Sequence, residues 1–243
     1  MSLAGRLFNV FATPGDVFQE VATGPPSTAN WLVPALLSLV ISWLSVWLIF
    51  SQDSIQHQLS EMTERALHPQ LESGRMSEQQ FEQSVKMAGF FQKAMGIAGP
   101  LFAAFLSPFW WGLILWLVGS KAMKGGFPFM KAVEAAGLSN MISVLDGIIR
   151  TLMIVGMGDL FASPSLSLLV HPFDPQNTVH SLLALVNVMT FWVLTVRAVG
   201  VAKLSGGSLA KALAWVFGIW IGYNGFFIGL GLGFKALMKH VTG

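Results

Sequence analysis

The chain has 243 residues, of which 53% are hydrophobic and only 11% are charged, whereas a soluble domain carries about 25% charged residues. Polar side chains are therefore too scarce to coat a soluble globule, and the composition predicts a membrane protein whose net charge of +2 reflects inner-leaflet lysines rather than nucleic-acid binding. Because the chain has no cysteine, disulfides and thiolate metal sites are excluded.

Residues 1–30 predict a short amphipathic segment ahead of the first membrane span. Apolar side chains recur there at helical spacing, and Thr13-Pro14 is typical of a helix start between two pieces. We expect this segment to pack against the membrane helices or to lie in the interface with Phe8, Phe11 and Phe18 inserted.

Five apolar stretches are long enough for a membrane helix, which needs about 20 residues to cross the hydrocarbon core. We predict transmembrane helices at residues 31–50, 96–118, 136–157, 181–202 and 212–234. The fold class is therefore an all-α polytopic membrane helix bundle, with one domain over 1–243. The last stretch contains Gly225, Gly229 and Gly233 at GxxxG spacing, and we expect these glycines to pack within the bundle.

Residues 52–94 form the longest polar stretch and predict a helical insertion on the extracytoplasmic side, between the first two spans. Within it, His57, Glu61, Glu64 and His68 fall on one helical face, at spacings of four, three and four. Two imidazoles and two carboxylates in this pattern are suitable ligands for one metal ion. The alternative is a solvated polar face beside an apolar stripe.

Four polar residues lie within or near predicted spans: Asp146, Arg150, Asn187 and Arg197. Ionisable side chains at membrane depth are costly and usually face the bundle interior in pairs. Asp146 and Arg150 are four residues apart and share a helical face, which favours a structural ion pair, with a proton or ion pathway as the alternative. Arg197 either reaches the lipid headgroups or meets Asp146.

Two loops between predicted spans share a pattern. Lys124-Gly125-Gly126 leads through a short spacer to Lys131-Ala132, and Ser205-Gly206-Gly207 leads to Lys211-Ala212. Each loop follows one apolar run and opens another, which indicates a duplicated membrane hairpin. The alternative is that short loops between membrane helices collect Gly and Lys independently. The candidate loop residues are Gly125, Gly126, Lys131, Gly206, Gly207 and Lys211.

The same loops orient the chain by the positive-inside rule. Together they carry five lysines against one acid, Glu134, whereas residues 158–180 contain no Lys or Arg. We therefore predict a cytoplasmic N-terminus and an extracytoplasmic C-terminus.

Two motifs carry a family resemblance: residues 7–14 (LFNVFATP) with Phe18 after them, and the segment from Val199 to Ala212 around the second Gly-Gly loop. With the five-span layout, they resemble the bacterial inner-membrane members of the Yip1 family over nearly the whole chain. The resemblance implies the same membrane orientation as the lysine distribution. It also implies a trafficking role, since eukaryotic relatives are associated with Rab-type GTPases and vesicle traffic.

Three functions fit these observations. A non-enzymatic scaffold or adaptor in the cell inner membrane ranks first, because the basic loops lie on one side and suit anionic lipid or a cytoplasmic or membrane protein partner. A small transporter or ion pathway using Asp146, Arg150 and Arg197 ranks second. An enzyme ranks last, since HExxH, GxSxG and cysteine are absent. We expect no cofactor, and a homo-oligomer is a further candidate assembly.

Overall fold

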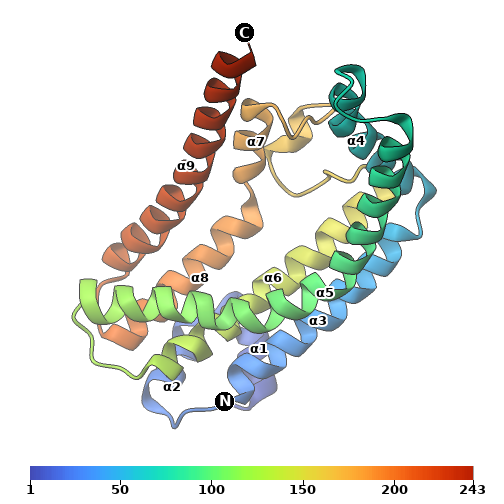
Figure 1. The fold of residues 1–243 in the computed structure, drawn as a ribbon. Coiled ribbons are helices and arrows are strands. Elements are labelled where there is room, and N and C mark those ends of the chain that lie inside the picture. Colours follow the sequence, from blue (N-terminus) through green and yellow to red (C-terminus); the bar gives the residue numbers. More distant parts are fainter. Residues whose placement is uncertain (243) are drawn as a thin grey trace.

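The computed structural model describes residues 1–242, with side chains as far as Gly233, and its regular secondary structure there is helical (Figure 1). The elements are α1 (Leu3–Ala12), α2 (Pro14–Thr23), α3 (Ala29–Phe50), α4 (Asp53–Glu72), α5 (Glu78–Leu117), the π-helical turn η1 (Val118–Ala122), α6 (Phe129–Met157), the 3₁₀ turn η2 (Leu166–Leu169), α7 (Thr178–Leu185), α8 (Val188–Ser205) and α9 (Leu209–Thr242).

Five helical stretches are long and apolar enough to cross a membrane, which confirms the all-α polytopic prediction. They are Ala29–Phe50, Glu78–Ala122, Phe129–Met157, Val188–Ser205 and Leu209–Gly233. The protein is therefore a multi-pass membrane protein in contact with the lipid bilayer.

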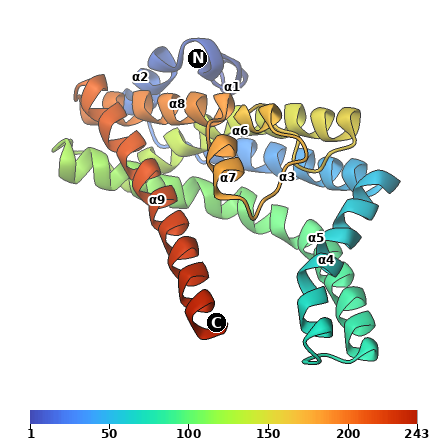
Figure 2. The same ribbon diagram turned by 90° about the horizontal axis from the view of Figure 1, so that it is seen from above.

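The bundle is organised around α6, which packs against α3, α5 and α8. All positions from 131 to 140 in α6 are buried. By contrast, α9 contacts mainly α8 and η1 and projects away from the other helices (Figure 2). Our expectation for its glycines was wrong: a Cβ at Gly225, Gly229 or Gly233 meets no described atom within 4 Å. These positions face outward rather than into the bundle.

The polar insertion is a helical hairpin. It consists of α4 and the first part of α5, and it extends away from the bundle on the side opposite α1 and α2 (Figure 2). Because α5 is continuous from Glu78, the predicted span at 96–118 is the second half of a longer helix. Ser77 begins α5 with a capping box: its hydroxyl accepts from the Gln80 amide at 3.3 Å, and Gln80 Oε1 accepts from the Ser77 amide at 2.9 Å.

The fourth span differs from the prediction, because a single helix over 181–202 is replaced by α7 and α8. The break lies at Asn187, whose Oδ1 accepts hydrogen bonds from the amides of Met189 (2.8 Å) and Thr190 (3.1 Å). Asn187 is thus the N-cap of α8 and satisfies two amides that lack helical partners. Its interpretation as a polar group inside the span was wrong.

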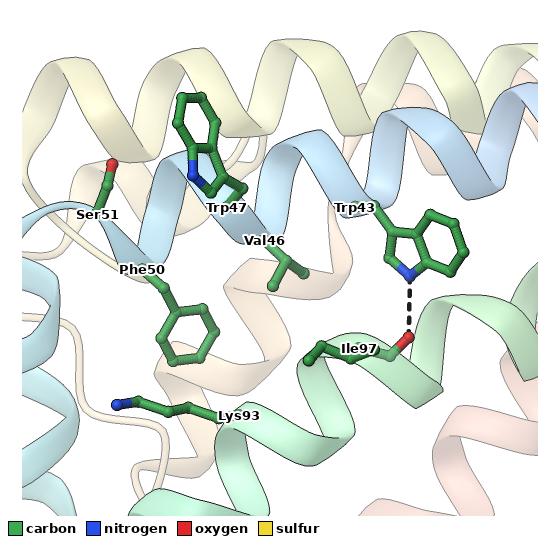
Figure 3. A pocket seen from close by; sticks show the side chains of 7 residues that line it. All are labelled: Trp43, Val46, Trp47, Phe50, Ser51, Lys93 and Ile97. Carbon is green, nitrogen blue, oxygen red and sulfur yellow. Dashed lines mark hydrogen bonds between the residues drawn. The ribbon is translucent and has the colours of Figure 1, made fainter.

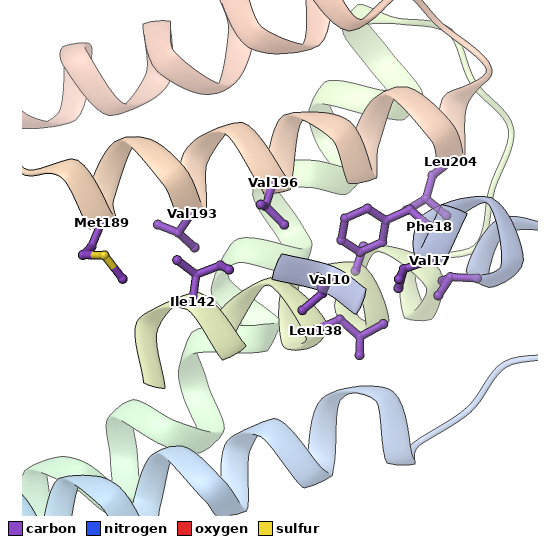
Figure 4. Packing of buried hydrophobic residues seen from close by; sticks show 11 residues of the cluster. Val10, Val17, Phe18, Leu138, Ile142, Met189, Val193, Val196 and Leu204 are labelled. Carbon is purple, nitrogen blue, oxygen red and sulfur yellow. The ribbon is translucent and has the colours of Figure 1, made fainter. Parts of the chain in front are cut away.

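The N-terminal helices pack against the bundle instead of lying apart from it. Val10, Val17 and Phe18 are fully buried, and they form a cluster with Leu138 of α6 and Val196 of α8 (Figure 4). Apolar side chains at helical spacing on both short helices produce this buried face. The apolar face of residues 1–30 therefore packs against one end of α6 and α8 and covers it.

Candidate functional site

The two Gly-Gly loops lie against each other at the end of the bundle that also holds α1 and α2. Ser205 Oγ lies 3.7 Å from Met123 Sδ. A Cβ at Gly125 would lie 2.5 Å from Ser205 Cα, so only glycine permits this approach of one backbone to the other. We call the surface formed by residues 121–128 and 203–211 the Gly-Gly loop face.

Each loop is closed by hydrogen bonds within its own backbone. The Gly125 amide donates to the Gly119 carbonyl at 2.8 Å, and the Gly207 amide donates to the Ala202 carbonyl at 3.1 Å. Gly206 ends α8 with φ at 65°, a left-handed conformation that glycine adopts without strain. The second Gly-Gly sequence therefore ends α8. The absence of a side chain at Gly125 allows the first loop to contact the second.

Four lysines of the Gly-Gly loop face have exposed side chains: Lys121, Lys124, Lys203 and Lys211. Beside them, a groove of about 450 Å³ is lined by Gln19 of α2, by Lys203, Gly206 and Gly207, and by Leu209 of α9. An exposed cationic surface with an adjoining groove suits an anionic lipid surface or an acidic protein segment.

Lys131 does not belong to this surface, so its interpretation as a loop residue was wrong. It lies in the first turn of α6, and its side chain is 6% exposed. Its Nζ lies 3.3 Å from Glu134 Oε1 and donates to the Pro25 carbonyl at 3.0 Å. The sequence shows a lysine three residues before a glutamate, but it does not show that both are buried.

A polar network extends from this ion pair to the N-terminal helices. Asn30 Nδ2 donates to Glu134 Oε2 at 2.7 Å, and Arg6 Nη1 donates to Asn30 Oδ1 at 3.2 Å. Glu20 then accepts from the terminal amino group of Met1 at 2.6 Å and from Arg6 Nε at 3.4 Å. The hydrogen bond from that amino group, followed by the one from Arg6, lowers the pKa of the Glu20 carboxyl below 4.5. The network fixes α1, α2 and α3 to the start of α6.

Arg197 is buried in the bundle and meets neither the headgroups nor Asp146. Its side chain is 4% exposed, its Nη2 donates to Asn140 Oδ1 at 2.9 Å, and its guanidinium lies 3.9 Å from the Trp111 ring centroid. Asn140 Nδ2 in turn donates to Ser107 Oγ at 3.1 Å. The arrangement is a cation–π contact joined to a polar chain across α5, α6 and α8.

A polar cavity of about 180 Å³ adjoins this chain, and its polar lining includes Ser38, Ser42, Ser107 and Asn140. Asp146 lies on the same helix as Asn140 but does not line the cavity. Its Oδ1 is buried and has no hydrogen-bond partner, and no salt bridge joins it to Arg150 in the described part of the chain. The predicted Asp146–Arg150 pair is therefore not a direct salt bridge, although the Arg150 charge still acts on the Asp146 carboxyl.

The four candidate metal ligands form separate pairs on α4. His57 Nε2 lies 3.1 Å from Glu61, Glu61 also pairs with Arg65, and Glu64 accepts from Ser60 at 3.0 Å. His68 pairs with Glu72 instead. Among the described residues, no three His, Cys, Asp or Glu side chains come close enough to hold a metal ion. The shared helical face thus acts as a solvated face with i,i+4 pairs.

Comparison with known families agrees with the architecture. A family model described as the Yip1 domain matches residues 8–232. The chain belongs to the Yip1 family. The matched region begins within α1 and ends within α9, so the N-terminal helices and both Gly-Gly loops are part of the Yip1 domain. Searches of curated proteins and of solved structures found no match.

Proposed function

We propose that this Yip1 family protein is a non-enzymatic adaptor of the cell inner membrane, which recruits or organises an anionic partner at the Gly-Gly loop face. The proposal places the N-terminus in the cytoplasm and the C-terminus outside, because the exposed lysines of both loops then face the inner leaflet. The partner class is a cytoplasmic or membrane protein with an acidic segment, docked beside anionic headgroups.

The observation that carries the proposal is the contact between Gly125 and Ser205. It joins two loops that are separated in the sequence by α6, α7 and most of α8. Together these loops form one surface with four exposed lysines. The buried network of Lys131, Glu134 and Asn30 lies at the start of α6, directly after the first loop in sequence, and holds the N-terminal helices in place. A surface built from two hairpins joined by this contact is preorganised for binding, which lowers the entropy lost on association.

The test is affinity purification from native membranes with quantitative mass spectrometry. We compare the wild type with a variant carrying Gln at Lys121, Lys124, Lys203 and Lys211. Because these side chains are exposed, the variant should fold, and we expect loss of a stoichiometric partner that the wild type retains. Unchanged recovery would exclude the loop lysines from partner binding.

A matched glycine pair tests the geometry. Gly125→Ala forces the two loops apart, whereas Gly126→Ala adds a methyl group in open space, with nothing within 4 Å. We expect partner recovery to fall for Gly125→Ala and to stay at the wild-type level for Gly126→Ala. Equal recovery from both variants would contradict a role for the joined loops.

A second candidate function, a small ion pathway, is supported by one observation: the polar cavity beside Asn140 and the buried Arg197 within the spans. Asp146, with its unpaired Oδ1, is the acidic group nearest in sequence to that lining. If the pathway exists, Asp146→Asn lowers ion flux in proteoliposomes. Flux equal to the wild type would remove Asp146 from it.

A further inference from the structure

A groove separate from the Gly-Gly loop face lies between α3 and α5, at the end of the bundle next to the α4–α5 hairpin. It has a volume of about 680 Å³. Its walls are apolar: Trp43, Val46, Trp47 and Phe50 come from α3, and Ile97 comes from α5. Figure 3 shows Trp43, Val46 and Phe50 facing Lys93 and Ile97 across the gap.

Few polar side-chain atoms line this groove, and those of Trp43 and Ser51 are hydrogen-bonded within the protein. Trp43 Nε1 donates to the Ile97 carbonyl at 2.9 Å (Figure 3), which links the two helices across one end of the groove. A peptide strand would need free donors and acceptors along the groove for its backbone groups. A hydrocarbon chain needs none, so the lining favours an aliphatic occupant.

A smaller polar pocket of about 170 Å³ continues the groove toward the hairpin. It shares Phe50 and Lys93 with the apolar groove. Its other polar groups come from both hairpin helices: Gln56, Ser60 and Thr63 from α4 and Gln92 from α5. Along this path the lining changes from apolar, through Lys93, to a mixture of neutral polar groups with Leu59 and Val85. A phospholipid likewise changes from apolar chain to phosphate to headgroup.

Lys93 supplies an unneutralised charge at the boundary. It is exposed, no carboxylate lines either pocket, and Lys93 forms no salt bridge within the described residues. It also lies where the sequence of α5 changes from polar to apolar, with Trp43 and Trp47 opposite on α3. Tryptophan and lysine at that level are typical of the membrane interface, where phosphate groups lie.

We propose that the α3–α5 groove binds one anionic phospholipid. An acyl chain lies along Trp43, Trp47 and Phe50, the phosphate pairs with Lys93, and the headgroup enters the polar pocket between α4 and α5. The lipid belongs to the leaflet beside the hairpin and fills the gap between α3 and the point where α5 leaves the bundle.

The test uses the full chain, purified in detergent, freed of lipid and titrated in native mass spectrometry. Phosphatidylglycerol and phosphatidylcholine with identical acyl chains are the two probes. We expect one phosphatidylglycerol to bind about 1.5-fold to fivefold more tightly than phosphatidylcholine, the range that one ion pair at an exposed site provides. Lys93→Gln should abolish this preference, because it weakens phosphatidylglycerol more than phosphatidylcholine, whose choline group offsets its phosphate charge.

Two further variants distinguish lipid binding in the groove from general attraction of lipid by surface charge. Lys86→Gln removes an exposed lysine of the same helix that lines neither pocket, and it should bind both lipids as the wild type does. Trp47→Ala removes an apolar wall and should weaken both lipids about equally. Equal affinity of the wild type for both lipids would overturn the proposal. So would an equal effect of Lys86→Gln and Lys93→Gln, because diffuse attraction would then explain the binding.

Discussion

Asn30 and Glu134 are joined by a 2.7 Å hydrogen bond across 104 residues of sequence, where α3 and α6 both begin. Lys131 completes the group from the preceding turn of α6, with both charged side chains almost fully buried. Polar groups buried at this depth require partners, since an unpaired buried charge is strongly destabilising. The bond therefore fixes where α3 enters the bundle relative to α6.

Removal of Glu134 should destabilise the protein severely. Glu134→Ala leaves the Lys131 ammonium buried without its counter-ion, and we expect a loss of about 3–5 kcal/mol in the free energy of unfolding. Thermal unfolding in detergent measures the effect, with Glu82→Gln on the exposed part of α5 as a control. Replacing the pair together, as Lys131→Met with Glu134→Leu, should recover part of the loss. No recovery would mean that the charges themselves are required.

The contact between the loops predicts a disulfide. The chain has no cysteine, so the double variant Met123→Cys with Ser205→Cys introduces the only two thiols. Ser205 Oγ lies 3.7 Å from Met123 Sδ, one bond beyond the position of a cysteine sulfur at 123, so the two loops are close enough that we expect mild oxidant to join the cysteines within one chain. Proteolysis between α6 and α8 followed by non-reducing electrophoresis detects the link. Fragments that separate without reductant would contradict the arrangement of the two loops.

Asn140 should matter more for stability than its size suggests. Asn140→Leu removes the acceptor of Arg197 Nη2 inside the bundle, and a lost hydrogen bond to a charged group costs about 1.5–3 kcal/mol. Combining it with Arg197→Met removes the buried charge as well and should restore part of the stability. Asn224→Leu serves as a control in the same thermal assay, since Asn224 bonds to the Trp220 carbonyl of its own helix. Equal losses for Asn140→Leu and Asn224→Leu would refute the role of the polar chain.

The Glu20 interaction predicts a pH dependence at the N-terminal helices. The folded state lowers the pKa of Glu20 below 4.5, so its stabilising contribution is complete above about pH 4.5 and is lost as the pH falls through the lowered pKa. The difference in unfolding temperature between the wild type and Glu20→Gln should therefore be present near neutral pH. It should shrink as the pH falls below 4.5 toward the lowered pKa of Glu20. A difference that stays constant over this range would show that the carboxylate charge is not involved.

The sequence by itself determined the features that depend on local pattern. Long apolar runs are sufficient for five membrane helices, since a chain in lipid must satisfy its backbone hydrogen bonds within each helix. Apolar side chains at helical spacing around Val10 and Val17 likewise indicate an amphipathic segment before any partner is known. The second Gly-Gly sequence likewise marks the end of a helix, because the left-handed backbone at Gly206 is a local requirement.

The tertiary structure decided which groups meet. The hydrogen bond from Lys131 to the Pro25 carbonyl, the Asn140 partner of Arg197 and the contact of Gly125 with Ser205 each join residues far apart in the sequence, and no periodicity encodes such pairs. The break at Asn187 was also hidden, because the apolar run continues across it and only the loop that packs there makes a cap preferable to a helix. Local hydropathy thus determines which segments enter the membrane, whereas helix packing determines which of their polar groups are paired and where lipid or a partner has room to bind.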